Sequence, residues 1–105
     1  MERNDVFNLI LAELDRQQAK WGPQDHPNGT GGPWQKLGLK NWRHTIKAVE
    51  AAGAITWRDI LHEEVLEAHA ESDPDALETE LVQVAAVAVQ WILAQRRARR
   101  KAGRK

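Results

Sequence analysis

Apolar residues recur at intervals of three and four along most of the chain, and this spacing places them on one face of an α-helix. The first such stretch predicts a helix over residues 5–20, capped by Asn4 or Asp5. Residues 22–33 then hold four Gly and three Pro, a composition that excludes a regular element and predicts a long loop. Loops of this length in a small domain are commonly functional.

The middle of the chain predicts two more helices. One covers residues 39–52, with a start as early as Trp34, because its apolar positions keep the spacing of three and four. Thr56, with Asp59 three residues later, resembles a capping box. A third helix is therefore expected to begin there and to end near residue 71.

A fourth helix follows at once. Ser72-Asp73-Pro74 combines an N-cap residue with a proline at the first helical position, and the helix is expected to reach about Arg97. Residues 84–89 read VAAVAV, so this helix is apolar on nearly every face and is expected to be buried on every side. A second copy must supply part of that cover, which predicts a homodimer or a tetramer. No segment predicts a strand, so the fold class is all-α, a four-helix bundle that assembles as an oligomer.

Composition limits the possibilities further. A chain of 105 residues is one domain, expected to span residues 1–98 and to be followed by a basic, frayed tail over residues 99–105. Cysteine is absent, which excludes a disulfide framework and a thiolate metal site. The N-terminus lacks the pattern of a signal peptide, and no unbroken apolar run has the length of a membrane span. We therefore expect a cytoplasmic protein without membrane association.

Charge is balanced over the whole chain but uneven along it. Residues 59–80 hold nine carboxylates with no Lys or Arg, whereas residues 96–105 hold seven bases. A solvated acidic face is the common explanation of such a run. However, like charges three and four residues apart destabilise a helix, and no base is interleaved here to relieve them.

The helical register suggests a different role for part of this acidic segment. Glu64 and Glu67 share one helix face beside the apolar stripe, and a short turn would bring them near Glu80 and Gln83 on the next helix. Oxygen ligands gathered in this way suit Mg²⁺ or Mn²⁺. Zinc is disfavoured, because His62 and His69 are seven residues apart, roughly 10 Å along a helix.

The same residues resemble a known family. The segment from Glu63 to Glu67, EEVLE, matches the EExxE motif of the MazG-like, all-α nucleoside triphosphate pyrophosphohydrolases. The segment from Glu80 to Gln83, ELVQ, stands where that family carries ExxD on the following helix. The likeness covers about the last two predicted helices, with looser support from QQAKWG before the loop. Small MazG-like proteins of actinobacteria and their phages come closest to the whole pattern.

The resemblance implies a reaction and a set of roles. A nucleoside triphosphate would be cleaved in a Mg²⁺-dependent step to a monophosphate and pyrophosphate. Glu64, Glu67 and Glu80 would be metal ligands, and Glu63 would be a ligand or would orient the attacking water. Gln83 stands in place of the family's Asp, so it can offer a carbonyl oxygen to the cation but no charge.

Large aromatic residues flank the predicted loop. Trp21 precedes it and Trp34 follows it. Each is expected either to anchor the loop by packing or to stack on a nucleobase. In the second case Gln18, Lys20 and His26 would contact the substrate beside Trp21.

Two alternatives to an active hydrolase stay open. The lost charge at Gln83 is compatible with a nucleotide-binding or metal-binding relative that turns over slowly or not at all. The basic tail is compatible with a helical interaction module that binds the phosphates of nucleic acid. Nucleic acid is the less favoured partner, and a nucleoside triphosphate is the expected one.

Overall fold

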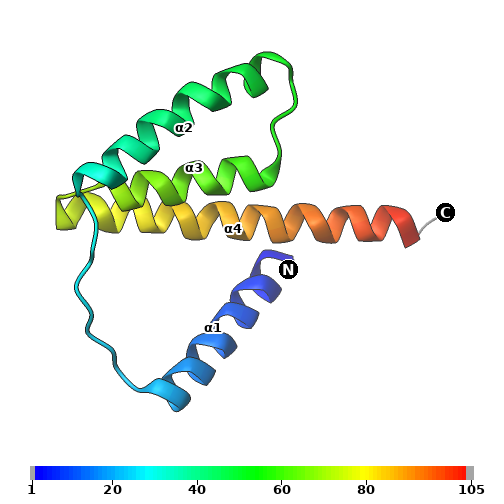
Figure 1. Cartoon of the computed structure of the whole chain (residues 1–105). Helices are drawn as coiled ribbons and strands as arrows, with labels where there is room; N and C mark the ends of the chain where they lie inside the picture. The colour runs from blue at the N-terminus through cyan, green and yellow to red at the C-terminus, as the bar shows by residue number, and fades with distance from the viewer. Residues whose placement is uncertain (1, 104–105) are drawn as a thin grey trace. The chain divides into compact units, whose positions relative to one another are not determined.

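The computed structural model describes residues 2–103, and this range contains four α-helices and no strand (Figure 1). The helices are α1 (Glu2–Trp21), α2 (Pro33–Ala51), α3 (Trp57–Ala70) and α4 (Pro74–Gly103). The all-α prediction is therefore confirmed. The chain divides into two compact units, one formed by residues up to Asn28 together with those from Val89 onward, the other by Gly29–Ala88. Each unit is described by itself.

The first helix is longer than its apolar pattern predicted. Because α1 already begins at Glu2, Asn4 and Asp5 lie inside its first turns, and the prediction that one of them caps the helix is wrong. Its end is set by Gly22, whose φ of +66° places it in the left-handed region. The Gly22 N–H donates to the carbonyl of Gln18 at 2.8 Å, which closes the last turn.

Proline and glycine set the limits of α2. The helix begins at Pro33, earlier than residue 39, because a proline in the first turn has no N–H that the helix would leave unpaired. Gly53, with φ +67°, ends it. The N–H of the next residue, Ala54, donates back to the Val49 carbonyl at 3.1 Å, which satisfies an acceptor at the helix end.

The start of α3 is the predicted capping box. The Asp59 N–H donates to Thr56 Oγ1, and the Thr56 N–H donates to Asp59 Oδ2, both at 3.2 Å. Two otherwise unpaired donors are thereby satisfied by residues three apart. This prediction is confirmed, and it fixes the register of the helix that carries the EExxE segment.

The turn over residues 71–73 joins α3 to α4. Asp73 caps α4 by accepting a hydrogen bond from the Ala76 N–H at 2.8 Å, and Pro74 occupies the first helical position, as expected. The helix continues to Gly103 instead of ending near Arg97. Residues 99–103 of the predicted frayed tail are thus helical, and the last two residues of that tail lie outside the described residues.

In the unit Gly29–Ala88, α2 lies against α3, with Leu39 and Ile46 of α2 and Ala68 of α3 buried. The ring of Trp42 on α2 meets that of His62 on α3 edge to face, with centroids 4.6 Å apart. This contact gives His62 a packing role.

The end of the Gly/Pro loop is held against the turn between α3 and α4. The Gly31 N–H donates to the His69 carbonyl at 2.9 Å. The φ of Gly31 is +79°, and a Cβ there would lie 2.6 Å from the Cα of Ser72. Only glycine fits this position.

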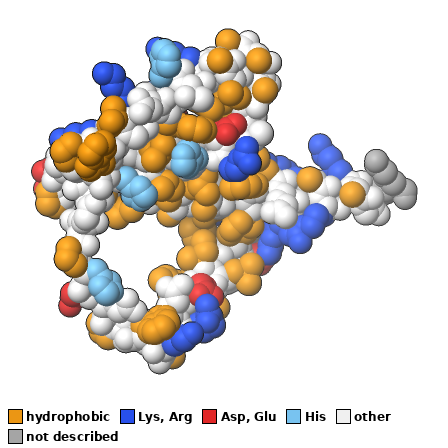
Figure 2. All heavy atoms as spheres, in the orientation of Figure 1, with side chains coloured by type: hydrophobic (Ala, Val, Ile, Leu, Met, Phe, Trp, Pro, Cys, Tyr) orange, Lys and Arg blue, Asp and Glu red, His pale blue; other side chains and the backbone are white. Residues whose placement is uncertain are grey.

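The apolar part of α4 is not buried on every side within one chain. Apolar side chains are abundant on the visible surface (Figure 2), and on α4 Leu81 and Val82 are 52% and 63% exposed. An 18-residue window of α4 has a mean hydropathy of 1.4, so its length and composition alone would allow a membrane span. The apolar stretch of α4 is interrupted by Gln83 and Gln90, and the core helix of a soluble protein can pass the same test.

Candidate metal centre

Three carboxylates from two helices converge in the unit Gly29–Ala88. Glu64 and Glu67 lie one turn apart on α3, and Glu80 lies on α4. Each contributes an oxygen, and the three oxygens all lie within 4.8 Å of one another. The capping box of α3 and the short turn before α4 set the two registers that bring them together. We call Glu64, Glu67 and Glu80 the carboxylate cluster.

The cluster is partly buried and poorly compensated. All three side chains are half-buried. Among residues 2–103, Oε2 of Glu64 and Oε2 of Glu80 are buried without a hydrogen-bond partner. A buried acceptor without a partner costs free energy, and more so when it carries charge. A cation bound by the cluster would offset the charge of both carboxylates.

The same surroundings shift two protonation equilibria. Burial raises the pKa of Glu64, and the nearby charges of Glu67, Glu80 and Glu63 raise it further. Burial also raises the pKa of Glu80, as do the charge of Glu67, a side-chain hydrogen bond with Glu67 and the charge of Glu71. The charge of Arg43 lowers the pKa of Glu80. Ionisation of the cluster is therefore opposed in the absence of an added cation.

A single cationic side chain reaches the cluster among the described ion pairs. Arg43 on α2 places Nη2 3.4 Å from Oε1 of Glu67. The guanidinium is 54% exposed and Glu67 is 22% exposed, so the pair is accessible from solvent. One positive charge beside three carboxylates leaves an excess of negative charge, which an all-oxygen site offers to Mg²⁺ or Mn²⁺.

Residues beside the cluster take different positions. Glu63 is half-buried, and its charge contributes to the raised pKa of Glu64. The Glu71 carboxylate accepts a hydrogen bond from the Asp73 N–H at 3.1 Å, which ties it to the turn between the helices. Gln83 lies one turn beyond Glu80 and is exposed. The roles predicted for Glu63 and Gln83 stay predictions.

The predicted substrate contacts Gln18, Lys20, Trp21 and His26 belong to the other unit. Gln18 and Trp21 line a surface pocket of about 490 Å³ at the end of α1. Lys20 Nζ lies 4.8 Å from the centroid of the Trp21 ring, a cation–π contact. His26 Nε2 lies 2.9 Å from the side-chain oxygen of Gln24. The structure groups Gln18, Lys20 and Trp21 around the end of α1, and their contact with a substrate stays a prediction.

The exposure of Trp21 and Trp34 bears on whether they pack against the loop or stack on a nucleobase. Trp21 is 60% exposed and Trp34 is 80% exposed, so neither ring is packed as a buried anchor of the loop. An exposed indole face is available for stacking.

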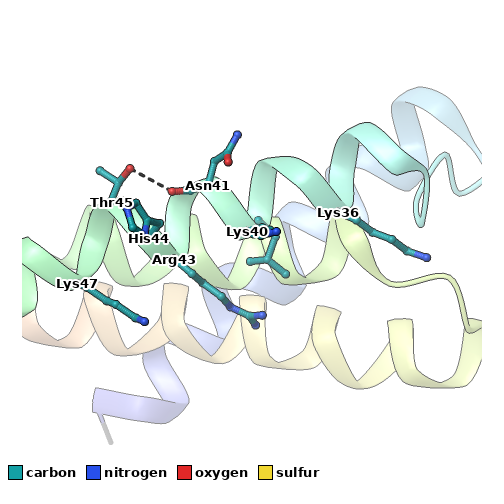
Figure 3. A pocket seen from close by; sticks show the side chains of 8 residues that line it. Lys36, Lys40, Asn41, Arg43, His44, Thr45 and Lys47 are labelled. Atoms are coloured by element: carbon teal, nitrogen blue, oxygen red, sulfur yellow. Dashed lines mark hydrogen bonds between the residues drawn. The ribbon is translucent and has the colours of Figure 1, made fainter.

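A row of basic residues on α2 was missed from the sequence. Lys36, Lys40, Arg43 and Lys47 recur at intervals of four, three and four, which places them on one helix face; we call them the α2 basic face. All four line one pocket of about 590 Å³, together with His44 and others (Figure 3). Their spacing of four, three and four residues in the sequence is the signal that predicts this face.

Comparison of the chain with family models, with curated proteins and with solved structures finds no match. The resemblance to the MazG-like hydrolases therefore rests on the residues of the two motifs alone.

Proposed function

We propose that the chain is a Mg²⁺- or Mn²⁺-dependent nucleoside triphosphate pyrophosphohydrolase of the MazG-like type. The observation that carries the proposal is the convergence of Glu64, Glu67 and Glu80 within 4.8 Å, with two buried carboxylate oxygens that lack a partner. The EExxE resemblance supplies the reaction class. The products would be a nucleoside monophosphate and pyrophosphate.

The residues of the site would have different roles in such a reaction. Glu64, Glu67 and Glu80 would hold the cation, which neutralises phosphate charge and acidifies a bound water. Glu63, directly before Glu64, would orient the attacking water or accept its proton. Water would attack the α-phosphorus, and the bond from that phosphorus to the α–β bridging oxygen would break as pyrophosphate leaves.

The exposed apolar side chains of α4 support assembly with a second copy of the chain. Leu81 and Val82 are more than half exposed, and an apolar helix face of this kind is usually covered in a soluble protein. A membrane is the other apolar environment that could cover α4. Glu80, Gln83 and Gln90 disfavour it, because charged and polar side chains are costly in hydrocarbon.

Gln83 favours one alternative, a nucleotide-binding or metal-binding protein with little or no turnover. Its amide can ligate a cation but adds no negative charge, so the site would hold its metal more weakly than one with Asp. The nucleic-acid alternative has less support. Arg100 of the basic tail, and Arg96 just before it, form ion pairs with Glu2 at 3.4 and 3.8 Å, which engages part of the charge that would contact phosphates.

A screen of ribonucleoside and deoxyribonucleoside triphosphates with Mg²⁺ or Mn²⁺ tests the proposal, with pyrophosphate as the product measured. We expect release by the wild-type chain and none by Glu67→Gln, because the amide removes a charged ligand. Glu78→Gln is the matched control, since Glu78 is an exposed acid two residues before Glu80. Equal rates in wild type and Glu67→Gln would refute the proposal. Cation binding without turnover would favour the non-catalytic alternative.

A further inference from the structure

Within residues 2–103, the three lysines of the α2 basic face form no ion pair that would explain their grouping. Helix α2 carries a single acid, Glu50, and four bases that share one face. Among residues 2–103, Arg43 is the member of this face that forms an ion pair. The three lysines are exposed. Like charges three and four residues apart repel one another, so the arrangement weakens the helix by itself.

The basic face borders the packed side of α2 and opens into a pocket. Leu39, which is buried between the helices, lines the same pocket of about 590 Å³ as the lysines. Figure 3 shows Lys36, Arg43 and Lys47 extending from one side of α2, with Asn41 and Thr45 on another side. The positive charges thus lie in a row along one pocket on the surface of α2.

Arg43 connects this surface to the carboxylate cluster. Its guanidinium donates a hydrogen bond to Oε1 of Glu67 at 3.4 Å. Successive members of the basic face are roughly 4.5–6 Å apart along the helix axis. Arg43, which lines the pocket and pairs with Glu67, therefore places the cluster beside the middle of the basic face, between Lys40 and Lys47.

We propose that the α2 basic face binds the polyphosphate chain of the ligand whose cation the carboxylate cluster holds. When the cation binds to the Glu67 carboxylate, it displaces the Arg43 guanidinium. Arg43 then donates its hydrogen bond to a phosphate oxygen instead. The inference rests on the proposed function, whose site it completes with a phosphate subsite. The ligand is a short polyphosphate, from a nucleoside triphosphate or an inorganic source. A long nucleic-acid backbone is disfavoured, because the adjacent carboxylates would repel it beyond the cation.

Calorimetric titration tests this subsite. The two ligands are inorganic tripolyphosphate and a nucleoside triphosphate, each titrated with and without Mg²⁺. We expect Lys40→Gln/Lys47→Gln to weaken tripolyphosphate binding at least about tenfold, from a few-fold loss per exposed charge pair. Mg²⁺ affinity should stay unchanged, since neither lysine forms an ion pair with the cluster. Arg58→Gln/Arg97→Gln removes the same charge elsewhere and should bind as the wild type does.

Arg43→Gln gives a result that general damage to the fold would not give. It should raise the affinity for Mg²⁺ alone, because Glu67 loses its competing cation, and it should lower the affinity for tripolyphosphate. Losses of both affinities, or of neither, would overturn the exchange of partners. Tighter binding by the nucleoside triphosphate than by tripolyphosphate, with the same dependence on Lys40 and Lys47, would identify the nucleotide as the source.

The inference and the proposed function can fail separately. Unchanged tripolyphosphate binding and unchanged KM in Lys40→Gln/Lys47→Gln would overturn the phosphate subsite while leaving hydrolysis intact. Equal losses in Arg58→Gln/Arg97→Gln would overturn it as well, since charge alone would then decide binding. Absence of cation binding and of pyrophosphate release in the wild type would instead remove the proposed function.

Discussion

Replacement of Glu80 by Gln should stabilise the metal-free protein and abolish its response to Mg²⁺. The amide keeps the size of the side chain and removes one of the three charges that lie within 4.8 Å. Stability and metal binding are thus expected to change in opposite directions. A merely structural acid would not show this combination.

The magnitude follows from the geometry. Two unit charges 4.8 Å apart repel by about 1 kcal/mol in water and by about 3.5 kcal/mol at an effective dielectric constant of 20. The cluster is half-buried, so solvent screening favours the lower value for each of the two pairs that Glu80 makes. Arg43 offsets part of the repulsion. We expect a net gain of roughly 1–2 kcal/mol, or about 4–8 °C in Tm for each kcal/mol in a chain of this size.

The gain should depend on pH. Because the pKa of Glu80 is raised in the folded protein, the folded state binds more protons than the unfolded state between the two pKa values. The stability of the wild type should therefore be lost as pH rises from the ordinary value of 4.5 through the raised pKa. Glu80→Gln lacks this titrating group. The variant should therefore be more stable than the wild type above pH 4.5, and the difference in stability should disappear at lower pH.

Thermal unfolding followed by circular dichroism, in EDTA and in saturating Mg²⁺ across this range of pH, measures both effects. Glu78→Gln serves as control. It removes an exposed charge near the start of the same helix and should be neutral or slightly destabilising, because negative charge is favourable there. A Glu80→Gln variant less stable than the wild type in EDTA at neutral pH would show that the repulsion is not the governing term.

Two other predictions concern the ligand shell and the assembly. Gln83→Asp should tighten Mg²⁺ binding and raise any rate of pyrophosphate release, and an unchanged affinity would place residue 83 outside the ligand shell. The wild type should have at least twice its chain mass of 11.9 kDa in solution at micromolar concentration. Val82→Glu should dissociate it with full helix content, since this side chain is 63% exposed in one chain, and a monomeric wild type would contradict the assembly.

The parts of the fold that local chemistry controls were predictable from the sequence. The capping box at Thr56 and Asp59 and the proline that opens α4 each act within a few residues. The errors also have local causes. The start of α2 was predicted too late because glycines directly precede Pro33. The end of α4 was predicted too early because the residues after Arg97 lack an apolar pattern, although the helix continues to Gly103.

The candidate site was predictable only in part. Glu64, Glu67 and Glu80 share a simple register across one short turn, so helix geometry alone brings them together. The contact between Arg43 and Glu67 joins residues 24 apart in the sequence and depends on how α2 packs against α3. Helical periodicity places Arg43 on a face of α2 but does not identify the residue of another helix that this face meets.

The close fit of Gly31 against Ser72 divides the long loop into segments with different tolerance to evolutionary change. Residues 23–28 are exposed, so insertions, deletions and peptide tags can be accommodated there at little cost. At Gly31 any side chain would be strained by its φ of +79° and would meet the backbone of Ser72. Homologous sequences should therefore drift in length and composition before this position and keep glycine at it, with a small residue facing it.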